Sequence, residues 1–577
     1  MTAVLRVEEP SARYLVRVEP ALAREFEVLA TAPGGVSRLR TLILRLAVHG
    51  KLVVQDERDE PVSFVISRIR ADRRTAGRLP SVAKPTEDQC RFALPFGWGW
   101  VRLDEIASTR LGKMLDKAKN TGALRQYLRN TNVQWHRFDL ADIKHLRLEE
   151  RELAEYRLVA GDLLVCEGGE PGRCAIWRDE AEEMYFQKAL HRIRPLGGVL
   201  PEFIQLCLAH DARAGVLESY FTGATIKHFA GQELNRYAFP LPPIAEQHRI
   251  VVRVEELMKL CDALEQNGRL ADEQHVRLTS TLFDALAASE SAHALAENWQ
   301  RVAEHFDLLL DRPEAIDALE QTILQLAVRG LLALQDPSDE HAASLRQRIH
   351  GERTRLFASG AAKREKALKP VEEDEHAFPL PCNWVWVRFD ELVRADKPIA
   401  YGVLVPGPDT PEGIPFVRLA DLSLECPAAQ PEKSISANVD AQFARTRLEG
   451  GEILLGVVGS IGKLGVAPDT WKGANIARAI CRIVPTSLVD RSYVLNLLQS
   501  EFMKARFSGD TRTLAQPTLN VGLIRECPTP LPPLAEQRRI VARVEELRRL
   551  CADLRRRLTQ AREAQSALAD ALVAEFA

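Results

Sequence analysis

The stretch "PLPPIAEQHRIVVRVEELMKLCDALE" at residues 240–265 recurs almost unchanged as "PLPPLAEQRRIVARVEELRRLCADLR" at residues 530–555. In each copy a proline pair, which suits the turn before a helix but not its interior, precedes apolar residues spaced 4, 3, 4 and 3 apart. That spacing is the a/d pattern of helices that wind around each other. The predicted seam consists of Ile250, Val254, Leu257, Cys261 and Leu264, and of Ile540, Val544, Leu547, Cys551 and Leu554.

Each proline pair is expected to begin a long, exposed helix. The first should extend to about residue 287 unless Gly268 interrupts it, and Glu246 and Glu536 fall in the first turn, where the helix dipole favours an acid. The copies could pack on each other, on another protein, or as ordinary core helices. A self-paired spacer best explains why their surface residues are nearly identical as well.

Two further blocks repeat in the same order, which predicts two homologous halves. "LRTLILRLAVHGKLVVQD" at residues 39–56 recurs at 319–336 as "LEQTILQLAVRGLLALQD", and "LPFGWGWVRLDEIA" from Leu94 recurs from Leu380 as "LPCNWVWVRFDELV". The material between the second and third blocks is less similar, but each half has a Gly-rich strand start, "GDLLVCEGG" and "GEILLGVVG". Short apolar runs with Gly, Pro and Asn between them indicate strands with short helices.

The predicted fold class is α/β (α+β), with two homologous globular domains separated by long helices. The expected segments are a helical region at 1–92, a globular domain at 93–239, a central helical region at 240–378, a second globular domain at 379–529 and a C-terminal helix at 530–577. A chain of 577 residues with 46% hydrophobic and 27% charged residues fits a globular protein of several domains. Ten cysteines without a C-x-x-C pair, and no apolar N-terminal segment, favour a cytoplasmic protein.

The repeated motifs resemble those of the specificity subunit of Type I restriction–modification enzymes. The segments that carry the resemblance are "PLPPxAEQxRIVxRVEEL" after each domain, "ILxLAVxGxLxxQD" ahead of each domain, the "LPxxWxWVRxDE" entry and the "GDLL…G…G" turn. Together they cover nearly the whole chain. The resemblance implies two α/β target-recognition domains, separated by helices that form an antiparallel coiled coil.

The resemblance also implies the partners. Each domain would read one half of a split, asymmetric target in double-stranded DNA, and the helices would fix the gap between the halves. Two modification (methyltransferase) subunits and then restriction subunits would dock on the chain. Those partners would bind S-adenosylmethionine, ATP and magnesium, so that this chain would hold no cofactor or metal.

The sequence lacks the motifs of a catalytic subunit. No Asn/Asp-Pro-Pro-aromatic loop is present, and the nearest match to a phosphate-binding loop, "GSIGKLG" from Gly459, has Leu464 where a magnesium-binding hydroxyl would stand. The chain is therefore expected to be non-catalytic. The alternative is a non-catalytic scaffold whose duplicated domains bind other proteins, and a single-chain nuclease is disfavoured.

The strongest local signal for DNA contact lies at Lys113–Arg137. This segment holds six basic residues against one acid, although the chain as a whole has a net charge of −3. Cations on phosphates supply affinity, and amides at base edges supply discrimination. The predicted phosphate contacts are Lys113, Lys117, Lys119, Arg125 and Arg129, and the predicted base contacts are Asn130, Asn132 and Gln134. A solvated surface is the alternative for any one of them.

A second loop precedes each proline-led helix and combines small hydroxyl residues with a base. The candidates there are Thr225 and Lys227 in the first half, and Thr511, Arg512, Thr513, Gln516 and Asn520 in the second. Tyr401 and Arg418 are further candidates in the second domain. Because the charge of each domain is nearly balanced, partner subunits are expected to supply part of the positive field.

Overall fold

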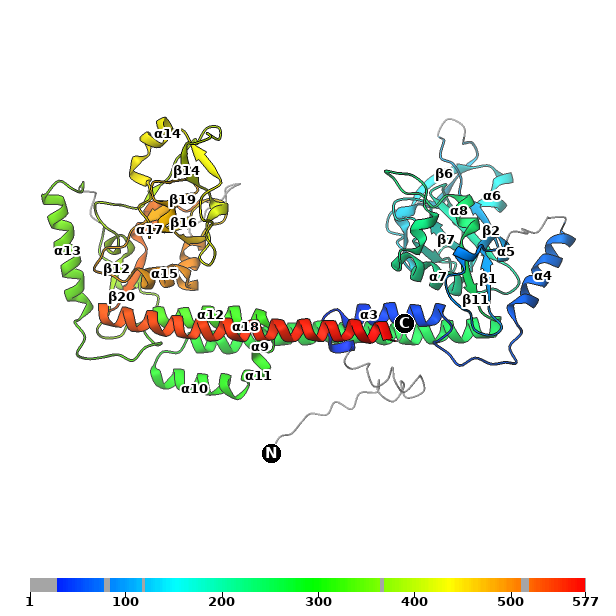
Figure 1. Cartoon of the computed structure of the whole chain (residues 1–577), viewed down its shortest axis with the longest axis horizontal. Coiled ribbons are helices and arrows are strands. Elements are labelled where there is room, and N and C mark those ends of the chain that lie inside the picture. Colours follow the sequence, from blue (N-terminus) through cyan, green and yellow to red (C-terminus); the bar gives the residue numbers. More distant parts are fainter. Residues whose placement is uncertain (1–28, 77–83, 117–119, 364–367, 510–517, 576–577) are drawn as a thin grey trace. The chain divides into compact units, whose positions relative to one another are not determined.

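The computed structural model describes residues 29–76, 84–116, 120–363, 368–509 and 518–575 (Figure 1). The chain divides into two compact units, unit 1 with Met1–Ala271 and Ala561–Ala577, and unit 2 with Asp272–Gln560. Each unit therefore contains the first part of one repeated helix and the last part of the other. Among the described residues, no helix combines the length and apolar character that crossing a membrane requires.

Unit 1 consists of a helical part and an α/β module. Its helices are α3 (Gly35–Val48), α4 (Val62–Thr75), α5 (Leu103–Ile106), α6 (Glu150–Tyr156), α7 (Pro201–Arg213) and α8 (Gly231–Arg236), besides the long helices described below. Its strands are β1 (Gly99–Arg102), β2 (Ala107–Leu111), β3 (Ala123–Leu128), β4 (Val133–Gln134), β5 (Arg137–Phe138), β6 (Lys144–Leu148), β7 (Leu163–Cys166), β8 (Cys174–Ile176), β9 (Tyr185–Phe186), β10 (Leu190–Pro195) and β11 (Ala238–Leu241).

The strands of unit 1 form small sheets around a central one. The central sheet has the order β2-β10-β7-β8 and is antiparallel throughout. A second sheet, β6-β3-β9, contains a parallel pair between β3 and β9. β1 pairs with β11, which brings the beginning and the end of the module together just before the first proline pair. Strand β7 is buried at all four positions, as its apolar sequence "LLVC" predicts.

Unit 2 repeats this plan with an inserted helical segment. Its helices are α10 (Ala292–Glu304), α11 (Phe306–Leu309), α12 (Pro313–Val328), α13 (Ala342–Ala358), α14 (Ala437–Gln442), α15 (Arg491–Gln499), α16 (Glu501–Gly509) and α17 (Val521–Glu526). Its strands are β12 (Val385–Arg388), β13 (Ala400–Tyr401), β14 (Ile414–Val417), β15 (Lys433–Ile435), β16 (Ile453–Gly456), β17 (Leu464–Val466), β18 (Asn475–Ile476), β19 (Ile480–Ile483) and β20 (Pro528–Leu531).

The two modules have the same sheet topology. The order β13-β19-β16-β17 matches β2-β10-β7-β8, and β15-β14-β18 matches β6-β3-β9, including the parallel pair. β12 pairs with β20 as β1 pairs with β11. The internal repeat expected from three motifs therefore extends to the less similar material between them.

The two repeated segments form the longest helices, α9 (Ile244–Ala287) and α18 (Leu534–Glu575), of 44 and 42 residues. A helix of 44 residues is about 66 Å long. Gly268 lies within α9, so the expected single helix to residue 287 is confirmed and the alternative of two shorter helices is excluded. A glycine in a helix costs about 1 kcal/mol relative to alanine, which the rest of a long helix offsets. Residues 265–274 of α9 are exposed.

The three repeated motifs meet where each long helix begins. In unit 1 the carboxylate of Glu246 accepts hydrogen bonds from Trp98 Nε1 (2.9 Å) and Gln55 Nε2 (2.8 Å). The side chain of Gln247 accepts from the backbone N–H of Leu200 (2.9 Å) and donates to the carbonyl of Pro242 (2.9 Å). We call this cluster the anchor of unit 1. Burial raises the pKa of Glu246, and the Trp98 hydrogen bond opposes that effect.

Unit 2 has the same anchor. Glu536 accepts from Trp384 Nε1 (2.9 Å) and from Gln335, while Gln537 accepts from the N–H of Asp490 (2.8 Å) and donates to the carbonyl of Pro532 (2.9 Å). Burial likewise raises the pKa of Glu536. The anchor explains why the Ala-Glu-Gln sequence follows each proline pair. The glutamate and the glutamine side chains are both buried, and each holds a different part of its unit.

The apolar seam of each long helix is covered by a short helix of the same unit. Ile250, Val254, Leu257 and Cys261 belong to a core cluster with Leu39, Leu42 and Ile43 of α3, and Leu264 packs against it. Ala569, Leu572 and Val573, from the end of α18, join the same cluster. Arg40 of α3 adds ion pairs to Asp262 and Glu265 of α9 (2.6 and 3.0 Å).

The seam of α18 is buried in the corresponding way in unit 2. Ile540, Val544 and Cys551 share a cluster with α12 residues and with Phe283 and Leu286 from the end of α9, and Leu547 and Leu554 pack against it. Each seam thus shares its core cluster with the end of the other long helix and also with α3 or α12. The sequence analysis did not consider α3 and α12 as partners of the seam.

Candidate nucleic-acid interface

The basic segment of unit 1 folds into β3, a 3-10 turn at Asn130–Asn132 and β4, and its cations are paired. Lys113 contacts Glu152, Arg125 contacts Glu183 (2.7 Å) and Arg129 contacts Asp142 (2.8 Å). These carboxylates come from parts of the module outside the basic segment. These three phosphate candidates therefore each have an intramolecular partner, and their contact with DNA stays a prediction. Lys117 and Lys119 lie outside the described residues.

The amide residues predicted to read bases have different environments. Asn132 is 3% exposed. Its side-chain oxygen accepts from the N–H of Arg129 (2.9 Å), and its amide nitrogen donates to the carbonyls of Asp139 and Asp142 (2.9 and 3.1 Å). Asn132 therefore fixes the turn and has no access to a base, which corrects its assignment. Asn130 and Gln134 are half-buried and donate to the carbonyls of Gly168 (3.3 Å) and Thr131 (3.1 Å).

Four loops of unit 1 lie together at one end of the central sheet, and we call them the recognition edge. Asn130 contacts the turn after β7 through Gly168, and Arg173 from the end of that turn donates to the carbonyl of Asn130 (3.0 Å). The N–H groups of Glu167 and Phe229 donate to the carbonyls of Ala189 and Glu167 (2.9 and 2.7 Å). The edge comprises residues 129–134, 167–173, 187–189 and 222–229.

The loop at residues 222–229 is an exposed hairpin. Thr222 and His228 exchange two backbone hydrogen bonds (2.8 Å each), and His228 also forms a bridge to Gly168. Thr225 and Lys227 lie exposed in the hairpin, and Lys227 is 3.3 Å from Glu218. Both side chains remain candidates for DNA contact on the recognition edge.

Unit 2 has a matching recognition edge with different side chains. The backbone N–H of Arg418 donates to the side chain of Asp421 (2.7 Å), as that of Arg129 donates to Asn132. Lys463 donates to the carbonyl of Leu419 (2.9 Å), as Arg173 does to Asn130. The side chain of Arg418 is paired with Asp421 and Glu432 (2.9 Å each). The same turn thus carries Asn130 and Thr131 in unit 1 but Leu419 and Ala420 in unit 2.

The other candidates of unit 2 lie beside this edge or outside the described residues. Tyr401 donates through its hydroxyl to the carbonyl of Leu519 (2.9 Å) and accepts from the N–H of Val521 (2.8 Å), so it holds the chain that leads into α17. Asn520 is exposed and caps α17 by accepting from the N–H of Gly522 (2.8 Å). The residues outside the described part of the chain are Thr511, Arg512, Thr513 and Gln516.

Two cations that the sequence analysis missed occupy equivalent positions of the two edges. Lys188 and Arg478 are exposed in the tight turn before β10 and before β19. Their backbone N–H groups donate to the carbonyls of Lys113 and Val403 (2.9 Å each), and no ion pair of either side chain occurs among the described residues. The alignment of "QKALHRIRP" at 187–195 with "ARAICRIVP" at 477–485 is the signal that could have found them.

In the described parts of the chain, no three His, Cys, Asp or Glu side chains are placed so that they could hold a metal ion. The surface offers amides, hydroxyls, backbone groups and a few unpaired cations. These groups suit the binding of a polyanion with base-edge contacts rather than a reaction.

Comparison with known proteins identifies the family. The model of the Type I restriction modification DNA specificity domain matches residues 95–272 and 409–563, more than half of the chain. The chain belongs to this family of Type I restriction–modification specificity subunits. The specificity subunit is the non-catalytic DNA-recognition subunit of these systems.

Two relatives from Escherichia coli are similar over almost the full chain. The specificity subunit of the Type I restriction enzyme EcoEI is 31% identical over 93% of this chain and 93% of its own length. That of EcoAI is 30% identical over the same shares. Among solved structures, the HsdS subunit from Thermoanaerobacter tengcongensis is 20% identical over 84% of this chain and 98% of its own, with a TM-score of 0.41.

Proposed function

We propose that this specificity subunit reads a bipartite DNA target, with the recognition edge of unit 1 on one half-site and that of unit 2 on the other. The observation that carries the proposal is the pair of matching edges. Two backbone hydrogen bonds of unit 1, Glu167 to Ala189 and Phe229 to Glu167, have counterparts in unit 2. The turn at the centre of each edge nevertheless carries Asn130 and Thr131 in one and Leu419 and Ala420 in the other. A shared frame with different side chains suits the reading of two different base sequences, which makes the target asymmetric.

The long helices are proposed to set the gap between the half-sites. Both α9 and α18 contribute residues to both units, and the anchors fix the start of each helix to its own module. A helix keeps a constant rise per residue, so its length translates into a fixed distance. We propose that α9 and α18 form an antiparallel pair that serves as this spacer.

Partner subunits complete the proposed function. With a net charge of −3, the chain carries no general excess of positive charge to attract DNA. We propose that two methyltransferase subunits dock on the chain, add that charge, and bind S-adenosylmethionine. Restriction subunits would then bring ATP and magnesium, and the complex would act on DNA in the cytoplasm.

The proposal predicts that the half-sites can be exchanged one at a time. Replacing residues 95–239 by the corresponding module of a relative should change one half-site and leave the other half-site and the gap unchanged. Replacing residues 379–529 should change only the other. Long-read mapping of methylated bases in cells that carry the assembled system would measure both.

A gel shift separates this proposal from a protein-binding scaffold. Duplex DNA that contains the mapped target should be retained by the chain together with its methyltransferase subunits, and weakly or not at all by the chain alone. Retention of no duplex in either case, with both half-sites unaffected by module exchange, would favour the scaffold.

A further inference from the structure

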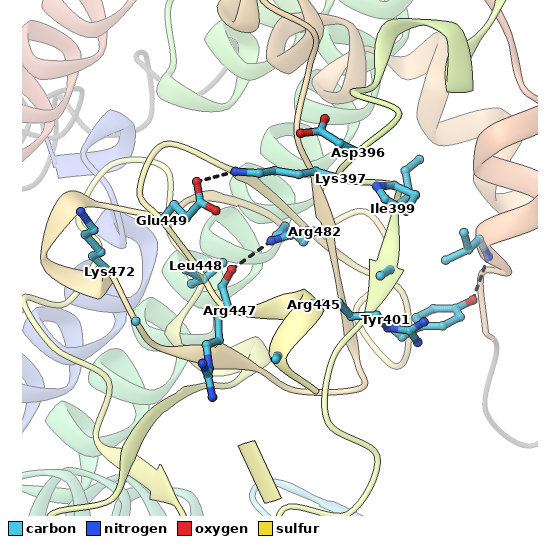
Figure 2. Close-up of a pocket in the computed structure, with 15 residues that line it drawn as sticks. Asp396, Lys397, Ile399, Tyr401, Arg445, Arg447, Leu448, Glu449, Lys472 and Arg482 are labelled. Carbon is cyan, nitrogen blue, oxygen red and sulfur yellow. Dashed lines mark hydrogen bonds and ion pairs between the residues drawn. The ribbon is translucent and has the colours of Figure 1, made fainter. Parts of the chain in front are cut away.

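A solvent-accessible cavity of about 620 Å³ lies beside β13 and β19 in unit 2 (Figure 2). The cations that line it are Lys397, Arg445, Arg447, Lys472 and Arg482, against the carboxylates of Asp396 and Glu449. Both carboxylates are already paired, Glu449 with Lys397 and Asp396 with Arg394 (2.6 Å). Arg447 is likewise paired, with Asp440. The lining cations that form no ion pair among the described residues are Arg445, Lys472 and Arg482, so the cavity has an excess of positive charge.

Arg482 is the most buried of these cations, with 5% of its surface exposed. Its Nη1 donates to the carbonyl of Arg447 (2.9 Å), whereas its Nε is buried without a partner. No carboxylate of the described residues forms an ion pair with it, and burial lowers the pKa of its guanidinium. The carboxylates of Glu452, Glu449 and Asp396 oppose this effect electrostatically, but none of them is in ion-pair contact with the guanidinium. A bound anion in direct contact would further offset the cost of burying this cation.

The equivalent residue of unit 1, Arg192, is also buried with its Nε unpartnered and its pKa lowered by burial, but its neighbours differ. "YFQKALHRIRP" at 185–195 aligns with "NIARAICRIVP" at 475–485, so Arg192 corresponds to Arg482. Arg192 donates to the carbonyls of Glu155 and Arg157 (2.9 and 3.2 Å) and lies over the ring of Phe186, 5.6 Å from its centre. Opposite Arg192 on β2 stands Arg110, which forms an ion pair with Glu155.

Each neighbour of Arg192 is replaced in unit 2. Ala400 stands opposite Arg482, where Arg110 stands opposite Arg192. By the same repeat, Ile476 takes the place of Phe186, and Arg445 takes the place of Glu155. Arg445 is exposed at the cavity and forms no ion pair within the described chain. Unit 1 thus places an arginine, an aromatic ring and a carboxylate around Arg192, whereas unit 2 has a cavity at the corresponding position with a further cation, Arg445, beside it.

We propose that this cavity is a phosphate-binding site that holds one backbone phosphate of the DNA duplex recognised by unit 2. Guanidinium groups bind phosphate oxygens in a paired geometry, and lysine adds a point charge. Tyr401 and Val521 line the cavity and connect it to the recognition edge through Leu519. A phosphate held here would fix the register of the duplex against that edge. The inference rests on the proposed function, because it assumes that unit 2 binds DNA.

The experiment measures the affinity of the assembled complex for a duplex carrying its mapped target, between about 50 and 200 mM salt. The double variant Ala400→Arg/Arg445→Glu copies the ion pair of unit 1 into the cavity. Loss of one phosphate contact should make the negative slope of log K against log salt shallower by about 0.9. This corresponds to roughly an eightfold weaker affinity at 0.1 M salt. Arg445→Gln, at an exposed position that does not affect folding of the core, should change the slope in the same direction.

Arg445→Lys keeps the charge and serves as the matched control, with a slope close to that of the wild type. Ethylation of single phosphates in the duplex gives a second readout: one ethylated phosphate in the half-site of unit 2 should weaken the wild-type complex but not the double variant. Unchanged slopes in both test variants, with normal wild-type binding, would overturn the cavity assignment alone.

Two further outcomes separate the possible ligands. If inorganic phosphate raises the Tm of the wild type but not of the double variant, while the DNA slopes stay equal, the site binds a free anion and the DNA assignment is overturned. Failure of the wild-type complex to bind the target duplex would overturn the proposed function and this inference together.

Discussion

The equivalent strands β10 and β19 show how single residues diverged on a common frame. His191 and Cys481 occupy the same position, and both are buried. Nε2 of His191 lies 3.0 Å from the carbonyl of Phe229, so the imidazole joins β10 to the hairpin of the recognition edge. Burial lowers the pKa of His191 from 6.5 to about 4. The histidine is therefore neutral in the folded protein at neutral pH.

This histidine predicts a loss of stability in acid. Between pH 6.5 and pH 4 the unfolded chain binds a proton that the folded chain does not, so the free energy of unfolding falls as the pH falls. For a pKa that drops from 6.5 to about 4, the loss is at most about 3 kcal/mol. His191→Cys, which copies unit 2, should reduce this pH dependence in urea unfolding measured across that range.

His145→Cys provides the control, because His145 is exposed on β6. Its stability should follow the wild-type curve from pH 6.5 to pH 4. A pH dependence that is the same in wild type and His191→Cys would show that the imidazole is not held neutral by burial.

At the scale of the elements, the internal repeat could be predicted from the sequence better than the packing partners of the long helices or the pairing of the surface cations. The proline pair and the apolar spacing predicted the start and the length of α9 and α18. The same spacing could not show that α3 and α12 cover the seam, because an apolar stripe specifies burial but not the partner. The pairing of the phosphate candidates could not be predicted for a similar reason: Glu152, Glu183 and Asp142, which pair with them, lie 13 to 58 residues away in the chain.

The anchor was visible in the sequence only as separate motifs. The glutamine, the tryptophan and the Ala-Glu-Gln sequence of each anchor lie far apart in the chain. Taken one at a time, each can be explained as an ordinary structural residue. Only the fold shows that Trp98 and Gln55 both donate to Glu246. The turn at Asn130–Asn132 is a similar case. The sequence does not distinguish Asn132, which is buried and holds the turn, from Asn130, which is half-buried.

The anchor predicts matched losses of stability in the two units. Trp98→Phe removes one of two donors to a buried carboxylate and should cost about 1–3 kcal/mol, because the oxygen is left without a partner. Trp384→Phe should cost about as much in unit 2. Hydrogen exchange of the first turn of α9 or of α18 would locate each effect in its own unit.

Trp299→Phe is the control for the loss of an indole, because Trp299 is 47% exposed and outside both anchors. It should leave exchange at both helix starts unchanged. Equal exchange in Trp98→Phe and the wild type would mean that the tryptophan hydrogen bond does not hold the helix start.

At the scale of the whole molecule, the proposed spacer makes a geometric prediction. Inserting four residues between Gly268 and Arg269, where α9 is exposed, and four between Gln560 and Ala561 of α18 lengthens both helices by about 6 Å. Four residues are close to one full turn, so the seams keep their faces. Methylation mapping should find both half-sites unchanged and the gap longer by about two base pairs.

The substitution Gly268→Ala is the control, because it changes the same exposed position without adding length. It should leave the gap as it is. Rewritten half-sites in the insertion variant, or a gap that does not respond, would contradict the role of the helices as a spacer.

The discontinuous composition of unit 1 has a consequence for biosynthesis. Its core includes Ala569, with Leu572 and Val573 packed against it, while the rest of the unit ends at residue 271. Translation runs from the N-terminus. The end of α18 can therefore cover the apolar face formed by α3 and α9 only after nearly three hundred further residues have left the ribosome. During that interval the nascent chain exposes a surface prone to aggregation. Truncation of the chain before Ala569 therefore damages the unit that was made first.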